Sequence, residues 1–424
     1  MHKYIKLTPN FHIFLNPAKR FKTDLNLTFS SGGAFFEKSN QKGLTHLLEH
    51  SIIKQTKKIN KKELNQLLFE KDIYRNASTS VLTQDISMSA HKDYAEQMLD
   101  LILNFAFDPN ISDEILEQEK QIVLREIAQR KGDPMYKLWR LVTENIYKEG
   151  SKDLCEVTGD EDIVANATIK DLKDIHKRVL SESHFLLSVV GGNVNEDQII
   201  KKAEKFAKEL PFEKTHPIDQ NAENFIQDFK YKPIVSELAH DHCVLTLSIP
   251  CRINYGNRSI RDIISEILFY YPEGIFYKIL REELGLIYSV DYYYDESLQL
   301  LRIRLVGELN NVNRLIEESI KILAEPAKYI NPKKVNIIKN LYIKRQQIAS
   351  DNPYTSVDFL MGTLLTYGIE QNYEEYLDEI KQLSFEEIIN YGFDIKAGIK
   401  DAFIVAVSKN KEIEKLNFEK FLNV

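Results

Sequence analysis

The feature that most constrains the fold is a weak internal repetition at a spacing of about 220 residues. The segment Leu245-Thr246-Leu247-Ser248-Ile249 resembles Leu25-Asn26-Leu27-Thr28-Phe29, and Asn331-Pro332 resembles Asp108-Pro109 later in each half. Matches in one order at one spacing indicate duplication of a unit of roughly 200 residues. The alternative is a coincidence between two ordinary segments.

Both halves mix strand and helix patterns, which predicts an α+β fold with a sheet packed against helices in each repeat. Residues 24–30 and 76–90 alternate apolar and polar side chains, so we expect each to be a strand. Residues 185–190 are continuously apolar, as in a buried strand. Residues 112–130 are predicted to be a helix that Ser112 caps.

The chain becomes polar and loses its periodicity between about Pro211 and Pro233. We therefore predict an N-terminal domain over residues 1–215, a linker over 216–233 and a C-terminal domain over 234–424.

The composition excludes several classes of function. With 56 basic and 63 acidic residues the net charge is −7, which argues against nucleic-acid and anionic-membrane partners. No apolar run approaches the roughly 18–20 residues that span a bilayer, and the first residues lack the apolar core of a signal peptide. We therefore expect a cytoplasmic protein.

The three cysteines, Cys155, Cys243 and Cys251, have no C-x-x-C spacing, so any metal would be held by nitrogen and oxygen.

His46-Leu47-Leu48-Glu49-His50 is the segment that carries chemistry. Positions i, i+3 and i+4 of a helix are neighbours, so two imidazoles and a carboxylate share one face. This H-x-x-E-H order is the reverse of the commoner zinc-protease order H-E-x-x-H. The alternative is a solvent-facing helix that carries two histidines by chance, because short motifs recur.

A hydrolytic zinc usually takes three protein ligands, so a third carboxylate or imidazole is expected on another element. The predicted helix 112–130 carries Glu119 and Glu126, which lie seven residues apart and therefore on one helix face.

With these residues the chain resembles the inverted zinc peptidases of the pitrilysin family, which include insulin-degrading enzyme and the mitochondrial processing peptidases. The third ligand of that family is a Glu roughly 76 residues after the second His, and Glu126 occupies this place. A second family Glu precedes the ligand by seven residues, where Glu119 stands. The resemblance implies one Zn²⁺ per chain, bound by His46, His50 and Glu126, with Glu119 supporting a ligand.

The resemblance also implies a substrate-binding region. Asn76-Ala77 matches an edge strand that receives peptide, and Arg281 to Tyr288 matches the family's R-E-x-x-G-L-x-Y stretch. In the family that Arg and Tyr contact substrate near the catalytic centre, so Arg281 and Tyr288 are expected to act there. An ordinary solvent-facing Arg and a strand Tyr are the alternative. Ser78 replaces a family Tyr, which leaves the subsite preference open.

The expected function is that of a zinc-dependent endopeptidase for short or unfolded peptides, with a metal-activated water as nucleophile and Glu49 as general base. The second possibility is a non-catalytic or partner-dependent subunit, because the family includes such members. A metal-dependent hydrolase of another substrate is a third. Family chains of this length pair into clam-like chambers, so we expect a homodimer, with a heterodimer of related chains as the alternative.

Overall fold

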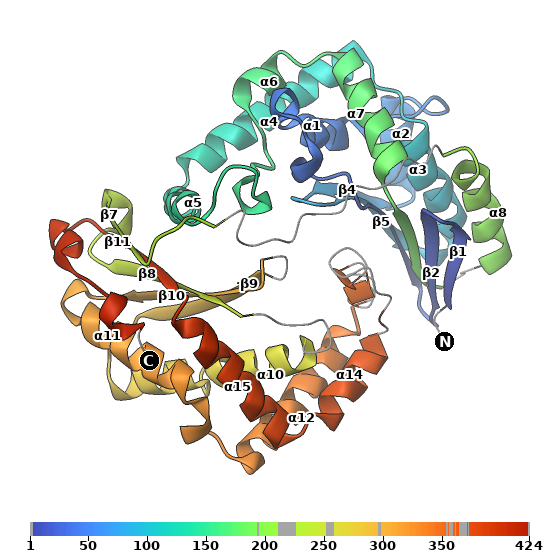
Figure 1. Cartoon of the computed structure of the whole chain (residues 1–424). Coiled ribbons are helices and arrows are strands. Elements are labelled where there is room, and N and C mark those ends of the chain that lie inside the picture. The colour runs from blue at the N-terminus through green and yellow to red at the C-terminus, as the bar shows by residue number, and fades with distance from the viewer. Residues whose placement is uncertain are drawn as a thin grey trace. The chain divides into compact units, whose positions relative to one another are not determined.

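The chain forms two compact units in the computed structural model (Figure 1). The first unit comprises Met1–Asp133 and Cys155–Pro217, and the second comprises Pro134–Leu154 and Ile218–Val424. The structure describes residues 3–192, 195–210, 226–251, 258–295, 298–352, 355, 359–360, 362–363, 371 and 373–422.

The first unit is built on a six-stranded sheet whose strand order is β1-β2-β6-β3-β5-β4. Only β2 and β6 run parallel, while the other neighbouring strands are antiparallel. Leu25, Leu27 and Phe29 alternate with polar residues, so the sheet has one apolar face that packs into the core. The strands are β1 (Lys3–Thr8), β2 (Phe11–Pro17), β3 (Lys22–Phe29), β4 (Tyr74–Thr79), β5 (Gln84–His91) and β6 (Phe185–Gly191).

The prediction of a single strand over residues 76–90 is wrong, since this stretch forms a hairpin of β4 and β5. The turn at Ser80–Thr83 is closed by the Ser80 N–H, which donates to the Thr83 carbonyl at 2.8 Å. Both strands keep the same alternation, which is why the sequence did not reveal the turn. As a result β4 lies at the edge of the sheet, paired with β5.

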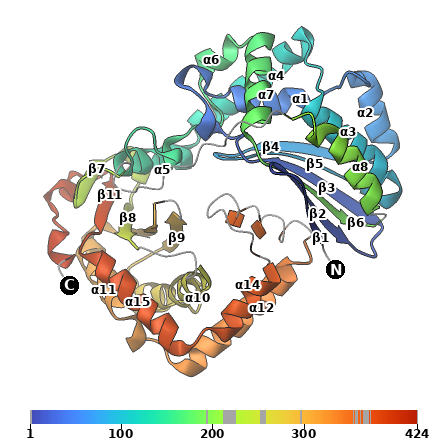
Figure 2. The ribbon, with the colours of Figure 1, turned by 45° about the vertical axis from the view of Figure 1, so that its right-hand side comes forward.

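Helices pack on the apolar face of this sheet (Figure 2). The predicted helix 112–130 is confirmed as α4, and the Ser112 hydroxyl accepts from the Ile115 N–H at 3.3 Å. The helices are α1 (Leu44–Ile52), α2 (Lys61–Glu70), α3 (Ala95–Phe107), α4 (Asp113–Gly132), α6 (Glu161–Ala165), α7 (Ile169–Glu182) and α8 (Glu196–Ala207).

The second unit has a five-stranded sheet of order β7-β11-β8-β10-β9, in which β9 lies at the edge. The strands are β7 (Tyr231–Val235), β8 (Cys243–Pro250), β9 (Ser289–Asp295), β10 (Leu300–Gly307) and β11 (Phe403–Ser408). Its helices are α5 (Pro134–Ile146), α10 (Arg258–Phe269), α11 (Val312–Ala324), α12 (Pro332–Ala349), α14 (Tyr373–Gln382) and α15 (Phe385–Ile399), with a π-helical segment at Tyr277–Glu283.

Residues 134–154 leave the first unit and complete the second, although the sequence-based boundaries place them in the first domain. Helix α5 packs on one face of the five-stranded sheet, where its Leu138, Val142 and Ile146 meet Val405 and Val407. Leu245 and Leu247 belong to a separate core cluster with the other helices. Both sheet faces are thus covered, which explains why β8 and β11 are buried along almost their whole length.

Buried charges also hold this segment. Lys152 Nζ lies 3.3 Å from Asp295 Oδ1, Arg302 pairs with Asp153 at 3.6 Å, and the Tyr147 hydroxyl donates to Asp295 at 3.4 Å. Of the predicted linker, residues 216–225 lie outside the described residues, and the last three residues of that linker, 231–233, already belong to β7. Among the described residues no helix is long and apolar enough to cross a membrane.

Candidate metal centre

Helix α1 presents His46, Glu49 and His50 from a largely buried position. Its Leu44, Leu47 and Leu48 enter the core of the first unit, and this fixes the opposite polar face toward α4. His46 and Glu49 are buried, and His50 is half-buried. The two imidazole rings meet edge to face with centroids 4.8 Å apart. The H-x-x-E-H segment therefore does not form a solvent-facing helix.

Glu126 on α4 completes a group of three candidate ligands. One ligand atom from each of His46, His50 and Glu126 lies within 4.8 Å of the others. Glu126 Oε2 is 3.5 Å from His46 Nε2 and 3.6 Å from His50 Nε2. Two atoms each about 2.0–2.1 Å from one tetrahedral zinc lie about 3.3–3.5 Å apart, so both nitrogen–oxygen separations are close to those of a shared zinc ion.

Glu119 lies behind His50 rather than beside the proposed ion. Its Oε2 is 3.2 Å from His50 Nδ1, and its Oε1 is 2.9 Å from Lys54 Nζ. The Nδ1–H of a neutral imidazole that donates to Glu119 leaves Nε2 unprotonated and directed at Glu126. Lys54 was not expected from the sequence, because nothing in the local pattern separates it from other surface lysines.

His46 is held differently. Burial lowers the pKa of this ring, and the backbone carbonyl of Thr158 opposes that effect; the ring Nδ1 is buried. Thr158 precedes Gly159, whose φ of +89° and close approach to Gly43 place this segment against the start of α1. No sequence pattern indicates this contact, because Thr158 and His46 are more than a hundred residues apart.

Burial dominates the electrostatics of the site. It lowers the pKa of His46 to about 4, assisted by the charge of His50, so His46 is neutral and ready to bind a metal. Burial also raises the pKa of Glu49 to about 7, against the opposing effects of His50, Thr79 and Lys54. For His50 burial alone would lower the pKa, but the hydrogen bond to Glu119 and the nearby carboxylates raise it.

Strand β4 contacts the same helix. The Thr79 hydroxyl donates to Glu49 Oε2 at 3.4 Å, and the Arg75 guanidinium donates to the Ile53 carbonyl at the end of α1. Between them Asn76 is exposed and Ala77 is half-buried on the edge strand. Thr79 and Arg75 are further residues that the sequence did not single out.

Arg281 and Tyr288 belong to the second unit. Arg281 lies in the π-helical segment with Glu282 Oε1 3.8 Å from its Nε, and Tyr288 directly precedes β9. The Tyr288 hydroxyl donates to Glu308 at 2.8 Å, and the side chain is 50% exposed. Both residues are thus at the surface of their unit.

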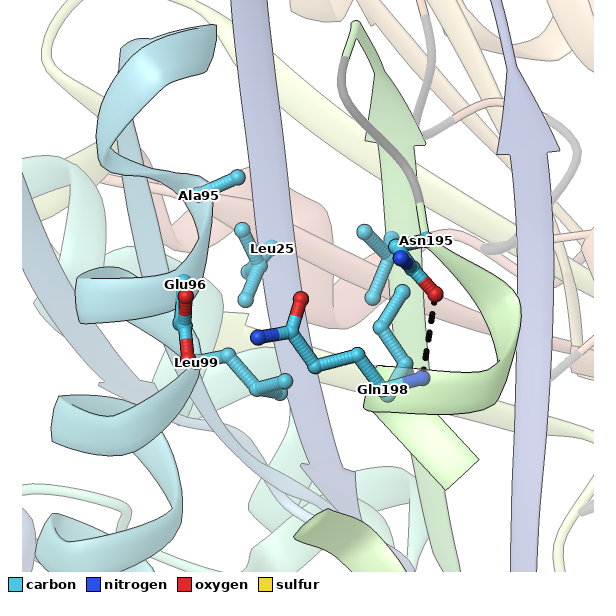
Figure 3. Close-up of a pocket in the computed structure, with 8 residues that line it drawn as sticks. Leu25, Ala95, Glu96, Leu99, Asn195 and Gln198 are labelled. Atoms are coloured by element: carbon cyan, nitrogen blue, oxygen red, sulfur yellow. Dashed lines mark hydrogen bonds between the residues drawn. The ribbon is translucent and has the colours of Figure 1, made fainter. Parts of the chain in front are cut away.

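A small hollow elsewhere in the first unit does not belong to this site (Figure 3). It lies between α3 and α8 over β3 and β6, and none of the candidate ligands lines it. Asn195 there caps α8 by accepting from the Gln198 N–H at 3.1 Å. Its lining residues are Leu25, Ala95, Glu96, Leu99, Val189, Asn195, Gln198 and Ile199.

Comparison with known proteins gives relatives of similar length. The "Non-peptidase homolog YmxG" of Helicobacter pylori is 22% identical over 405 residues, which is 92% of this chain and 89% of its own. The "Uncharacterized zinc protease YmfH" of Bacillus subtilis is 21% identical over 359 residues, or 82% of this chain and 80% of its own. The "Mitochondrial-processing peptidase subunit beta" of Caenorhabditis elegans is 21% identical over 182 residues, or 43% of this chain and 39% of its own.

Solved structures share the fold. A protease from Helicobacter pylori superposes with a TM-score of 0.75 at 17% identity, covering 96% of this chain and 99% of its own. A peptidase M16 inactive domain from Pseudomonas fluorescens does so with a TM-score of 0.75 at 15% identity, covering 96% and 98%.

Two family models match the chain in succession. The model described as "Insulinase (Peptidase family M16)" matches residues 23–154, which include His46, Glu49, His50, Glu119 and Glu126. The model described as "Peptidase M16 inactive domain" matches residues 166–342. The chain, a two-domain α+β protein, therefore belongs to the M16 (insulinase) peptidase family.

Proposed function

We propose that this protein is a zinc-dependent endopeptidase that hydrolyses short or unfolded peptides. The observation that carries the proposal is the convergence of His46, His50 and Glu126 within one ligand sphere, with the buried Glu49 beside them. Family membership and the zinc-protease names of relatives agree with it.

The residues have distinct roles in this proposal. His46, His50 and Glu126 would hold the zinc ion, which would supply a Lewis acid for the scissile carbonyl and for the attacking water. Glu49 Oε2 lies 3.8 Å from His46 Nε2, next to the ligand sphere, and accepts the proton of the attacking water. Glu49 then delivers that proton to the leaving amine. Glu119 keeps His50 in the tautomer that a metal requires.

Strand β4 offers a means of binding peptide. An extended peptide that pairs with the outer edge of β4 by main-chain hydrogen bonds would pass Asn76 and Ala77, close to Thr79, which contacts Glu49. Only an unfolded or short chain has its backbone available for this pairing. Arg281 and Tyr288 are proposed to donate hydrogen bonds to the substrate carbonyl as it gains negative charge.

A second candidate function is a non-catalytic or partner-dependent subunit. The relative from Helicobacter pylori is named a non-peptidase homolog, and the relative from Caenorhabditis elegans is named a subunit.

We also infer a homodimer of this two-unit chain, with duplication as the origin of the two units. Size-exclusion chromatography with light scattering tests the dimer, and a monomer at all concentrations would refute it.

The experiment for the catalytic proposal is digestion of an unstructured peptide mixture, with cut sites identified by mass spectrometry. We expect cleavage by the wild type and loss of at least about 100-fold in rate in Glu49→Gln. Glu70→Gln, an exposed substitution on α2, is the matched control and should cleave normally. Full activity in Glu49→Gln would refute the assigned base. Zinc-loaded wild type without cleavage, alone or with a related chain, would favour the non-catalytic subunit.

A further inference from the structure

The start of helix α1 has an unusual support. Its N-cap residue is Gly43, at φ +92°, so no capping side chain is available from the usual position. The carboxylate of Glu37 takes over this task from outside the helix. Oε2 of Glu37 accepts from the Gly43 N–H at 2.8 Å, and Oε1 accepts from the Thr45 N–H at 2.7 Å and the Thr45 hydroxyl at 2.6 Å.

We propose that Glu37 is a positioning residue of the metal centre, which sets the first turn of α1 and thereby the place of His46. The inference rests on the proposed zinc site. His46 is the third residue of the helix, one position after Thr45, so it belongs to the turn that Glu37 holds. Glu126 comes from α4, and the fit of the three ligands depends on how accurately α1 is placed against that helix.

The support continues from Glu37 into the β4–β5 hairpin. The short helical turn before Glu37, Ala34–Phe36, is bound to the hairpin turn. The Ala34 N–H donates to the Ser80 carbonyl at 3.2 Å, and the Phe35 N–H donates to the Val81 carbonyl at 2.9 Å. Ser80 and Val81, which follow Thr79 in the hairpin turn, therefore also anchor the segment that leads to Glu37. The carboxylate of Glu37 in turn caps α1.

A second contact from the same hairpin reaches the same turn. Gln84, the first residue of β5, is 1% exposed, and its Nε2 donates to the Thr45 carbonyl at 2.9 Å. Thr45 is therefore held at its N–H, hydroxyl and carbonyl by Glu37 and Gln84. A carboxylate is also favourable here because the N-terminus of a helix carries partial positive charge.

The test compares zinc affinity with stability. Glu37→Gln keeps the size of the side chain but presents an amide NH₂ where Oε2 accepted a hydrogen bond. Metal-free wild type and variant are titrated with zinc against a chromophoric chelator, and their thermal unfolding is recorded without metal. We expect about a tenfold loss of zinc affinity in Glu37→Gln, at the lower end of the range for residues that orient ligands.

Replacement of a residue that only caps a helix would lower stability without changing zinc affinity. Asn60→Ala is the matched control, because Asn60 caps α2 by accepting from the Glu63 N–H at 3.0 Å. It should lower the unfolding temperature and leave zinc affinity unchanged. Should Glu37→Gln not fold, Thr45→Val, which removes one of the three hydrogen bonds, is expected to lose zinc affinity in the same direction by about threefold.

Unchanged zinc affinity in folded Glu37→Gln would overturn the inference, as would an equal loss in Asn60→Ala. These outcomes are distinct from a failure of the proposed zinc site, which would show as a wild type that binds no zinc. Peptide cleavage is not needed for either readout.

Discussion

Glu119 Oε2 lies 3.2 Å from His50 Nδ1, on the side of the ring away from the Nε2 that faces Glu126. Lys54 approaches the other oxygen of Glu119. Burial alone would raise the pKa of Glu119, but its hydrogen bonds to His50 and Lys54 lower it, so the carboxylate stays ionised. An ionised acceptor at Nδ1 makes His50 a better metal ligand.

Glu119→Gln is therefore expected to bind zinc about 10–100-fold more weakly than the wild type while remaining folded. Zinc affinity by chelator competition is the measurement. Glu117→Gln, an exposed residue on the same helix that pairs with Lys120, is the control and should bind zinc normally. Equal affinities for all three proteins would contradict the role assigned to Glu119.

Thr79→Val should reduce turnover without affecting zinc. The Thr79 hydroxyl donates to Glu49 Oε2, and removal of a hydrogen bond of about 1 kcal/mol corresponds to roughly a fivefold lower kcat. The assay is peptide cleavage at saturating substrate, with zinc content measured on the same sample. Thr8→Val, which removes a hydroxyl that donates to Asn10 Oδ1 at 2.9 Å on β1, should leave kcat unchanged, and a kcat equally low in both variants would count against Thr79.

Gly159→Ala should destabilise the first unit. Gly159 has φ +89°, and an added Cβ would lie 2.2 Å from the Gly43 Cα, so we expect a loss of more than about 2 kcal/mol in unfolding free energy. Gly132→Ala is the matched substitution, because nothing lies within 4 Å of its added Cβ at the end of α4. It should be neutral or stabilising by about 0.5–1 kcal/mol in urea unfolding. Similar losses for both would show that the close approach to Gly43 is unimportant.

The charged cluster that holds residues 134–154 predicts a pH effect. Burial, together with the Asp295 carboxylate, raises the pKa of Asp153 to about 6 in the folded protein. The folded state binds the Asp153 proton more tightly than the unfolded chain does. The contribution of this proton to the unfolding free energy is therefore complete below about pH 4 and is lost as the pH rises through about 6. Relative to Asp153→Asn, the wild type should lose unfolding free energy as the pH rises across this interval.

The measurement is urea unfolding of both proteins from pH 4 to pH 7. Asp174→Asn removes an exposed carboxylate that pairs with Lys170 on α7, and its pH dependence should match that of the wild type. Parallel curves for wild type and Asp153→Asn would show that Asp153 does not titrate in this interval.

Much of the site was predictable because helical spacing is local. The i, i+3 and i+4 positions placed His46, Glu49 and His50 on one face of a helix, and the helix with Glu119 and Glu126 formed as expected. The contacts of Glu37, Lys54, Thr79 and Thr158 with α1 and its ligands arise from tertiary packing, which leaves no periodic signal. The placement of α5 likewise depends on the apolar second face of the five-stranded sheet, to which no sequence pattern pointed.

The second unit also contains tertiary contacts that no sequence pattern predicted. A shift of about 220 residues carries His46 and His50 to Glu266 and Tyr270, which shows only that the ligands are missing there. In the structure Arg345 of α12 pairs with Glu266, and its guanidinium lies 4.0 Å from the centre of the Tyr270 ring. Arg345 thus contacts both side chains from a neighbouring helix, through an ion pair to Glu266 and a cation–π contact with Tyr270.

The most direct test of the account is an equilibrium zinc titration of the metal-free protein, with Glu49→Gln and Glu126→Gln measured alongside. If His46, His50 and Glu126 hold the metal and Glu49 does not, the wild type and Glu49→Gln will each bind one zinc per chain with similar affinity. Glu126→Gln, which replaces the charged carboxylate with a neutral amide, will bind at least about 100-fold more weakly. A wild type that binds no zinc, or a Glu126→Gln variant that binds it as tightly as the wild type, would contradict the account.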